Sequence, residues 1–126
     1  PFLQVIVEEI WLLQSYIGFD IAVSKMARIA ASYGKWGIFG LFVTQRPEQS
    51  VVPKLIRDNC MTRIATKVIG EASSQIILGD TRGCGAAAYL QGKGHLAVVD
   101  EDNSYPYRLQ GLLITDENIK EIGEYG

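Results

Sequence analysis

The sequence predicts an α/β domain with a mostly parallel sheet, helices on both faces and an antiparallel hairpin near its carboxyl end. Segments typical of strands and helices alternate through the first two-thirds of the 126 residues, as they do where helices connect parallel strands. Later, two apolar segments flank a turn-like stretch, which indicates antiparallel strands. No internal repeat or low-complexity linker divides the chain, so we expect residues 1–126 to form one domain or part of one.

Three strands and three helices are expected in this first part. Short runs rich in β-branched and apolar residues indicate buried strands, and apolar residues at near-helical spacing indicate helices. The expected strands are residues 2–7, 37–44 and 62–69, and the expected helices are residues 20–33, 51–58 and 71–79. Asp20 is the expected cap at the start of the first helix, and Gly34 its expected end.

The last third of the chain predicts a hairpin and a closing helix. GCGAAA, residues 83–88, is interpreted as a loop or the start of a helix. Residues 95–100 and 105–114 are expected to pair around the turn DEDNS. The closing helix, residues 115–125, begins with Thr115 three residues before Asn118, a spacing typical of helix capping.

Charge gives only weak information about partners. The chain has 12 basic and 14 acidic residues, a net charge of 12 − 14 = −2, so it is not a polycation overall. From Arg46 to Arg82 six basic residues accompany four acidic ones, whereas from Gly83 onward three accompany seven. The mildly positive middle is compatible with an anionic partner or with an ordinary solvated surface.

Other features point to a cytoplasmic domain without structural metal. The longest strongly apolar run, residues 37–43, is far shorter than the roughly 20 residues of a membrane helix, and no leader sequence opens the chain. Cys60 and Cys84 form no C-x-x-C motif, and His95 is the single histidine. A zinc site or a disulfide framework is therefore not expected, and His95 is interpreted as a surface or partly buried strand residue.

Polar residues follow the first two expected strands. Glu8 and Glu9 end the first strand, and Thr44 and Gln45 end the second. Because ligands of parallel sheets bind at the carboxyl ends of the strands, this edge is the candidate site. Two carboxylates and a Thr-Gln pair can hold magnesium, orient a water and sense a phosphate. The alternative is that these carboxylates only lie on the surface or begin a helix.

Six segments carry a resemblance to a known family. They are VIVEEIWLL, GIFGLFVTQRP, VVPKLIRDNCMTRIATKV, SSQIILGD, GKGHLAVV and YRLQGLLITDENI, in this order. They resemble the carboxyl-terminal half of the motor domain of FtsK/SpoIIIE DNA translocases, and PKLIRDN and GEASS are similar to the plasmid-transfer branch of actinobacteria. The resemblance covers nearly the whole chain and implies part of a RecA-like P-loop ATPase, which assembles as a ring, usually a hexamer, around double-stranded DNA.

The resemblance also implies roles for individual residues. Glu8 matches the acidic residue that holds Mg²⁺ through water, although the family normally has Asp there. Glu9 matches the glutamate that activates the attacking water. Thr44 and Gln45 match the pair that senses the γ-phosphate of ATP. Arg46 matches a pore-loop residue that contacts DNA phosphates without sequence preference.

The sequence departs from the family at the residues that act between subunits or on DNA. Gly34 occupies the position of the trans-acting arginine, and Lys35 is the nearby substitute, with a point charge in place of a bidentate fork. Arg63 is interpreted as a subunit-interface or a solvated arginine. The second pore loop carries Glu71 and Gln75 where basic residues are usual. The remaining candidates for DNA contact there are Lys67 and Arg82.

No segment matches the phosphate-binding motif G-x-x-x-x-G-K-[ST]; GDTRGCG and GKG both lack its spacing. The family carries this motif upstream of the Glu8 strand, so residues 1–126 are expected to lack that part.

The leading hypothesis is that the chain is part of an ATP-driven DNA translocase for DNA transfer or segregation, with any membrane anchor upstream. The alternatives are a degenerate module acting in ring assembly or DNA binding, and an unrelated small α/β binding domain. Trp11 and Trp36 are interpreted as packing residues. A sheet that lacks its phosphate-loop strand exposes an edge and apolar surface, so the chain is expected to be marginally stable or to self-associate.

Overall fold

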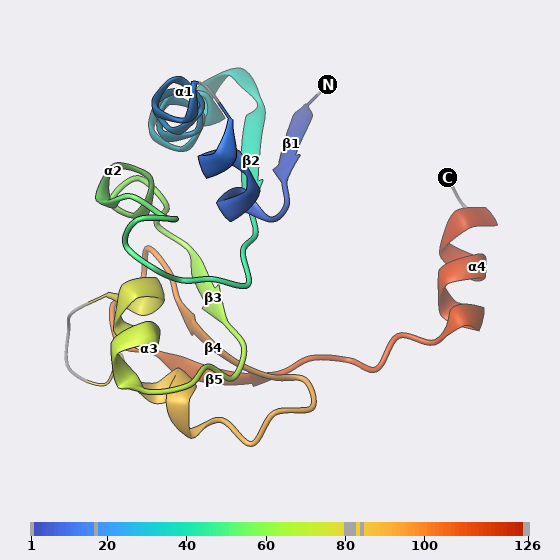
Figure 1. Cartoon of the computed structure of the whole chain (residues 1–126). Helices are drawn as coiled ribbons and strands as arrows, with labels where there is room; N and C mark the ends of the chain where they lie inside the picture. The colour runs from blue at the N-terminus through green and yellow to red at the C-terminus, as the bar shows by residue number, and fades with distance from the viewer. Residues whose placement is uncertain (1, 17, 80–82, 84, 125–126) are drawn as a thin grey trace.

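The computed structural model describes residues 2–16, 18–79, 83 and 85–124. It confirms the α/β class (Figure 1). The α-helices and strands follow in the order β1 (Leu3–Val7), α1 (Phe19–Ser32), β2 (Ile38–Phe42), α2 (Lys54–Arg57), β3 (Arg63–Ala65), α3 (Glu71–Leu78), β4 (His95–Val99), β5 (Tyr107–Gln110) and α4 (Asp116–Glu124). Three 3₁₀ helices stand between them: η1 (Ile10–Ser15), η2 (Gly34–Trp36) and η3 (Ala86–Tyr89).

Strands β1 and β2 form a parallel pair that is covered on one face by α1. The register runs from Leu3 opposite Ile38 to Val7 opposite Phe42. Val7 and Phe42 pack against the core under α1. Gly40 allows this approach, because a Cβ there would lie 2.6 Å from the Phe42 ring and 3.1 Å from Cγ2 of Ile29.

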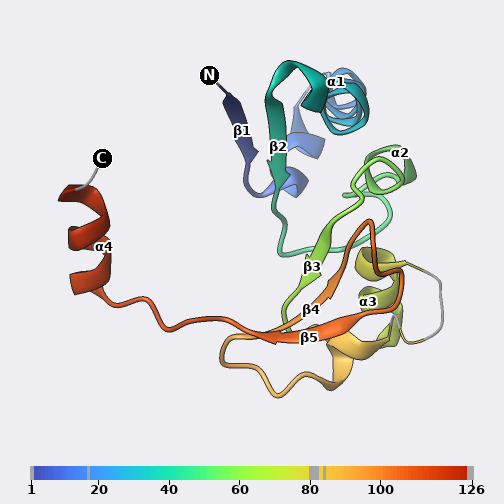
Figure 2. The same cartoon turned by 180° about the vertical axis from the view of Figure 1, so that it is seen from behind.

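The opposite face of this pair is open in the described part of the chain. Ile6, Phe39 and Leu41 point to that face and are about half exposed. Helices on both faces of the sheet were predicted, but α1 covers one face only, and no described helix lies over the other (Figure 2). The continuous apolar runs of β1 and β2 predicted buried strands, but every residue of both strands is exposed or only partly buried, because this face is open.

The third strand belongs to a second sheet, which has the order β3-β4-β5 and is antiparallel throughout. The predicted strand 62–69 is only Arg63–Ala65, with Arg63 opposite Val99 and Ala65 opposite Ala97. The sheet was predicted to be mostly parallel, and this strand instead runs antiparallel to β4. Alternating apolar residues predict a strand but do not specify the direction of its neighbour. The predicted hairpin of β4 and β5 is confirmed.

Each sheet has its own hydrophobic core. The first lies under α1 and α2, and the second lies between the β3-β4-β5 sheet and α3 with η3. The buried residues of the first core are Ile10, Val23, Met26, Ala27, Val51 and Ile56. Those of the second core are Ala65, Leu78, Ala87, Leu90, Ala97 and Val99.

Arg57 links the two cores. It lies at the end of α2, its Nε donates to the carbonyl of Val52 at 3.1 Å, and its Nη1 donates to the carbonyl of Ile76 in α3 at 3.3 Å. Because one rigid guanidinium satisfies carbonyls on both sides, it fixes α3 relative to α2.

The termini of two helices test the predicted caps. Helix α1 begins after Gly18 and not after Asp20, which lies in the first turn of the helix. A carboxylate in the first turn is favoured by the helix dipole, which explains why the pattern looked like a cap. In α4 the capping pair is confirmed: the Thr115 N–H donates to Oδ1 of Asn118 at 3.0 Å, and the Asn118 N–H donates to Oγ1 of Thr115 at 3.3 Å.

Residues 112–124 form an arm that extends away from the rest of the molecule (Figure 1). Leu112 and Leu113 in its extended part are 90% and 89% exposed, and Ile119 and Ile122 in α4 are also exposed. Such a continuous apolar surface is unusual for a solvated segment. Among the helices that the structure describes, none is both long enough and apolar enough to cross a membrane.

Candidate functional site at the ends of β1 and β2

The carboxyl ends of β1 and β2 meet, as the sequence predicted for neighbouring parallel strands. The N–H of Val43 donates to the carbonyl of Val7 at 2.8 Å, and the N–H of Ile10 donates to the carbonyl of Val43 at 3.3 Å. These bonds enclose Glu8 and Glu9 on one strand end and place Thr44 just beyond the other. The four polar residues of the predicted site therefore stand at one edge of the sheet.

Glu9 has a left-handed backbone, with φ 54° and ψ 53°. A residue with a Cβ pays about 1–2 kcal/mol for this conformation, and such strain is concentrated at functional sites. The turn reverses the chain between β1 and η1 and leaves the half-buried Glu9 side chain beside Trp11. The indole N–H of Trp11 donates a hydrogen bond to Oε2 of Glu9.

Arg46 approaches the same indole from the loop after β2. Its guanidinium carbon lies 4.5 Å from the centre of the Trp11 ring, a cation–π distance. The N–H of Arg46 donates to Oγ1 of Thr44 at 3.1 Å, which forms a tight turn directly after β2. The loop is also held to η1 by Gln14, whose amide donates to the carbonyl of Ser50 at 2.6 Å.

Two other predicted residues are accessible at this edge. Glu8 and Gln45 are exposed, whereas Thr44 is half-buried. The described residues contain no group of three His, Cys, Asp or Glu side chains able to hold a metal by themselves.

The predicted interface residues lie in different surroundings. Lys35 is exposed in η2, and its Nζ lies 5.7 Å from the centre of the Trp36 ring. Arg63 is half-buried next to the end of α3, with Nη1 3.4 Å from the position that a Cβ on Gly79 would take. Nε of Arg63 is buried and has no hydrogen-bond partner among the described residues. Burial raises the pKa of the nearby Cys60 thiol, and the Arg63 charge partly offsets this.

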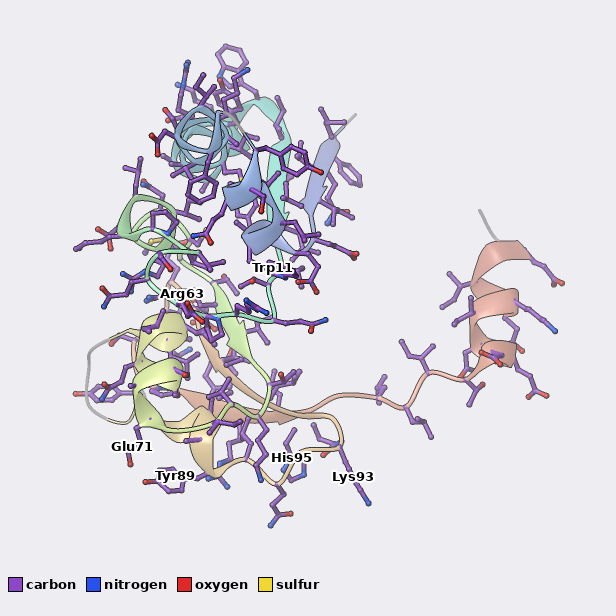
Figure 3. All side chains as sticks on the ribbon, in the orientation of Figure 1. Trp11, Arg63, Glu71, Tyr89, Lys93 and His95 are labelled. Atoms are coloured by element: carbon purple, nitrogen blue, oxygen red, sulfur yellow. The ribbon has the colours of Figure 1, made fainter. Side chains whose placement is uncertain are left out.

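Lys93, in the Gly92–Gly94 loop, lies at the end of the molecule away from Trp11 (Figure 3). Lys67 runs along this loop, with Cδ 4.0 Å from the position of a Cβ on Gly92. Lys93 has a left-handed backbone with φ 50°, and its carbonyl accepts a hydrogen bond from the Gln110 amide at 3.3 Å. A hollow of about 250 Å³ beside it is lined by Gln91, His95, Arg108, Leu109 and Gln110.

The remaining predicted positions are placed as follows. Glu71, on the expected second pore loop, accepts a hydrogen bond from the Tyr89 hydroxyl, which raises the pKa of Tyr89. Gln75 is exposed on α3. Arg82 lies outside the described residues.

Trp11 was interpreted as a packing residue, and the structure confirms this, because Trp11 packs against the core under α1. Its contacts with Glu9 and Arg46 were not predicted, because they join residues from separate segments. Lys93 and Arg108 were not singled out either: Lys93 lies in the loop that Lys67 approaches at Gly92, and Arg108 lines the hollow beside it.

Comparisons with known proteins identify relatives over nearly the whole chain. Proteins named DNA translocase FtsK from Chlamydia muridarum and Staphylococcus aureus are 33% identical over 124 residues and 31% identical over 130 residues, covering 97% and 99% of this chain. The chain spans 15% of the length of each. No protein-family model matches.

Two solved structures have the same fold. The TcpA conjugation coupling protein of pCW3, determined with ATPγS, superposes with a TM-score of 0.76 at 17% identity and covers 99% of this chain and 37% of its own. The cytoplasmic domain of the type VII secretion ATPase EccC of Thermomonospora curvata gives 0.73 at 18% identity and covers 92% of this chain and 13% of its own.

Proposed function

We propose, from this homology to the FtsK DNA translocases, that residues 1–126 are part of an ATP-driven motor that moves double-stranded DNA in DNA transfer or segregation. The observation that carries the proposal is the convergence of Glu9 and Thr44 at the paired ends of β1 and β2. In a parallel sheet this edge is where ligands bind. The FtsK-named relatives match the sequence on both sides of it.

In this proposal Glu9 is the general base that takes the proton from the attacking water. Its carboxylate is already oriented by the hydrogen bond from Trp11, and orienting a base in this way removes part of the entropic cost of proton transfer. Thr44 and Gln45 sense the γ-phosphate from the neighbouring strand end. A tight turn joins Thr44 to Arg46. A movement of Thr44 on contact with the γ-phosphate would therefore also move the loop that carries Arg46 to the DNA.

The residues present fit an ATP-bound magnesium ion at this edge. Glu8 is exposed and would hold Mg²⁺ through a water molecule. When bound, the ion neutralises charge on the phosphates. The phosphate-binding motif is not among residues 1–126. This chain would therefore supply the residues that act in hydrolysis, and another segment would supply the loop that binds the phosphates.

DNA contact is proposed at two places. Arg46 would contact the DNA backbone from the loop after β2. Lys67, with Lys93 and Arg108 close to the same loop and hollow, would form a second contact, with Arg82 as a further candidate. Both contacts are charge-based and independent of sequence.

Assembly as a ring, with a hexamer as the first expectation, would place the nucleotide between two subunits. Lys35 is exposed and near the position where an arginine acts in trans in the family, so it is the candidate for that role. Arg63, which is half-buried beside the end of α3, is the second candidate.

A second function deserves a test because of two sequence features. Glu8 stands where the family has Asp, and Gly34 stands where it has the trans-acting arginine. We expect both changes to weaken hydrolysis more than binding. A module that binds DNA or assembles rings without hydrolysing ATP is therefore the alternative.

The test is ATP hydrolysis and displacement of a third strand from duplex DNA by the full-length protein that carries this chain. We expect DNA-stimulated hydrolysis in the wild type, and a loss of about 10²–10⁴-fold in Glu9→Gln with nucleotide binding retained. Glu48→Gln, in the loop after β2, is the control. A wild type that binds DNA without hydrolysing ATP would favour the alternative function.

A further inference from the structure

Three side chains from separate segments form a continuous chain of contacts at the proposed site. Glu9 follows β1, Trp11 lies in η1 and Arg46 lies in the loop after β2. One indole serves two charges: its N–H donates to the Glu9 carboxylate, and its face holds the Arg46 guanidinium 4.5 Å from the ring centre. The proposed base and the proposed DNA contact are therefore joined through a single residue.

We propose that Trp11 is a positioning residue that couples DNA contact by Arg46 to the orientation of Glu9. The inference rests on the proposed function of these two residues and adds the connection between them. Without DNA, Arg46 rests on the indole face. When the guanidinium moves to a DNA phosphate, the indole loses one of the three contacts that hold it, the others being Glu9 and the core under α1, and its hydrogen bond to Glu9 changes as a result.

The energies of the two contacts make such an exchange possible. A cation–π contact at a partly exposed site contributes about 0.5–1 kcal/mol, which is less than a charge-assisted hydrogen bond of about 1.5–3 kcal/mol. A phosphate can therefore remove Arg46 from Trp11 at little cost. The hydrogen bond between Trp11 and Glu9 is the stronger of the two contacts, so the indole remains attached to the carboxylate and transmits the change.

The structure also supplies a control for simple loosening of the loop. Gln14, in the same 3₁₀ helix, donates to the Ser50 carbonyl at 2.6 Å and anchors the loop without contacting Glu9. Gln14→Leu removes this anchor and leaves Trp11 with both partners. Trp11→Phe keeps an aromatic face for Arg46 and removes the N–H that reaches Glu9.

The first experiment measures the ratio of DNA-stimulated to basal kcat in the full-length protein. We expect Trp11→Phe to lower this ratio about tenfold, the effect of losing one hydrogen bond to a charged group, and Gln14→Leu to leave it unchanged. An unchanged ratio in Trp11→Phe, with a wild type that responds to DNA, would overturn the inference. An equal loss in Gln14→Leu would also overturn it, because loop anchoring would then be the cause.

The second experiment observes Trp11 directly. Residues 1–126 contain two tryptophans, Trp11 and Trp36, so in the full-length protein the difference in emission between Trp36→Phe and the double variant Trp36→Phe, Trp11→Phe isolates the signal of Trp11. We expect a short DNA duplex at low salt to shift the Trp11 emission toward the spectrum that Arg46→Gln gives without DNA. DNA binding that depends on Arg46 but leaves the emission unaltered would contradict the exchange. A wild type that neither hydrolyses ATP nor binds DNA would instead overturn the proposed function itself.

Discussion

The guanidinium of Arg46 lies over the ring of Trp11, 4.5 Å from its centre, although the two residues are 35 positions apart in the sequence. This contact closes the carboxyl edge of the β1-β2 pair and brings a loop that is proposed to meet DNA beside a carboxylate that is proposed to act on water. In such a site, a substitution at one residue can be measured by its effect on the function proposed for the other.

Removing the Arg46 charge should weaken DNA binding and its dependence on salt. Each phosphate contact contributes a slope of about 0.9 to the plot of log affinity against log salt concentration. We expect Arg46→Gln to lower the magnitude of this slope by about 0.9, the value of one phosphate contact. Arg28→Gln, on an arginine that lies 6.0 Å from the Tyr33 ring on α1, is the matched control. Fluorescence anisotropy with a labelled duplex at several salt concentrations measures both slopes. Equal slopes for the two variants would show that Arg46 does not contact DNA.

Truncating Ser74 should destabilise the second core. Ser74 is fully buried in α3, and its Oγ accepts the N–H of Ala87 at 3.1 Å. Ser74→Ala leaves this buried N–H without that acceptor, which costs about 1–3 kcal/mol in the free energy of unfolding. Ser24→Ala, on an exposed position of α1, should change it by less than about 0.5 kcal/mol. Urea unfolding of both variants tests the difference, and equal stabilities would show that the bond contributes nothing.

The turn between β4 and β5 should lose stability in acid. The Asp100 carboxylate accepts hydrogen bonds from the Tyr107 hydroxyl at 2.5 Å and from the Asn103 N–H at 2.8 Å, and these lower its pKa below the ordinary 3.8. Because the folded-state pKa is depressed, the stabilisation is present above 3.8 and is lost as the pH falls through the lower, folded value.

Tyr107→Phe removes the first of these bonds and therefore separates its contribution. The difference in urea midpoint between wild type and Tyr107→Phe should be constant near neutral pH and should shrink below the ordinary carboxylate pKa. The same bond raises the pKa of Tyr107, so the difference should also shrink in strong alkali, above the ordinary tyrosine value of 10. A difference that is independent of pH would show that the bond does not stabilise the fold.

The apolar arm should make residues 1–126 associate with one another in isolation. Leu112 and Leu113 are almost fully exposed, and burying each contributes about 1.5–3 kcal/mol. The double variant Leu112→Ser, Leu113→Ser should shift sedimentation profiles toward monomer. Ile69→Ser, at a position 98% exposed in the β3-α3 connection, is the control and should not. A wild-type monomer with one cooperative unfolding transition across concentrations would contradict the expectation.

Much of the local structure could be predicted from the sequence. The short apolar runs predicted β1 and β2, the two apolar segments around DEDNS predicted the β4-β5 hairpin, and the spacing of Thr115 and Asn118 predicted the start of α4. These features depend on neighbours in the chain, whose side-chain spacing is set by helix and strand periods. The polar residues at the ends of β1 and β2 were predicted as a site for the same reason.

Other features depended on the tertiary structure. The direction of β3 is decided by its pairing with β4, and the open face of the first sheet is decided by which segments pack there. The contact of Arg46 with Trp11, and the proximity of Lys67 to Gly92, join residues from separate elements. The sequence by itself determined which elements form, because helix and strand periods are local, although the bounds of β3 and the start of α1 differ from the predicted ones. Only the tertiary structure decided which strand ends and loops meet, because that depends on packing between segments that share no pattern.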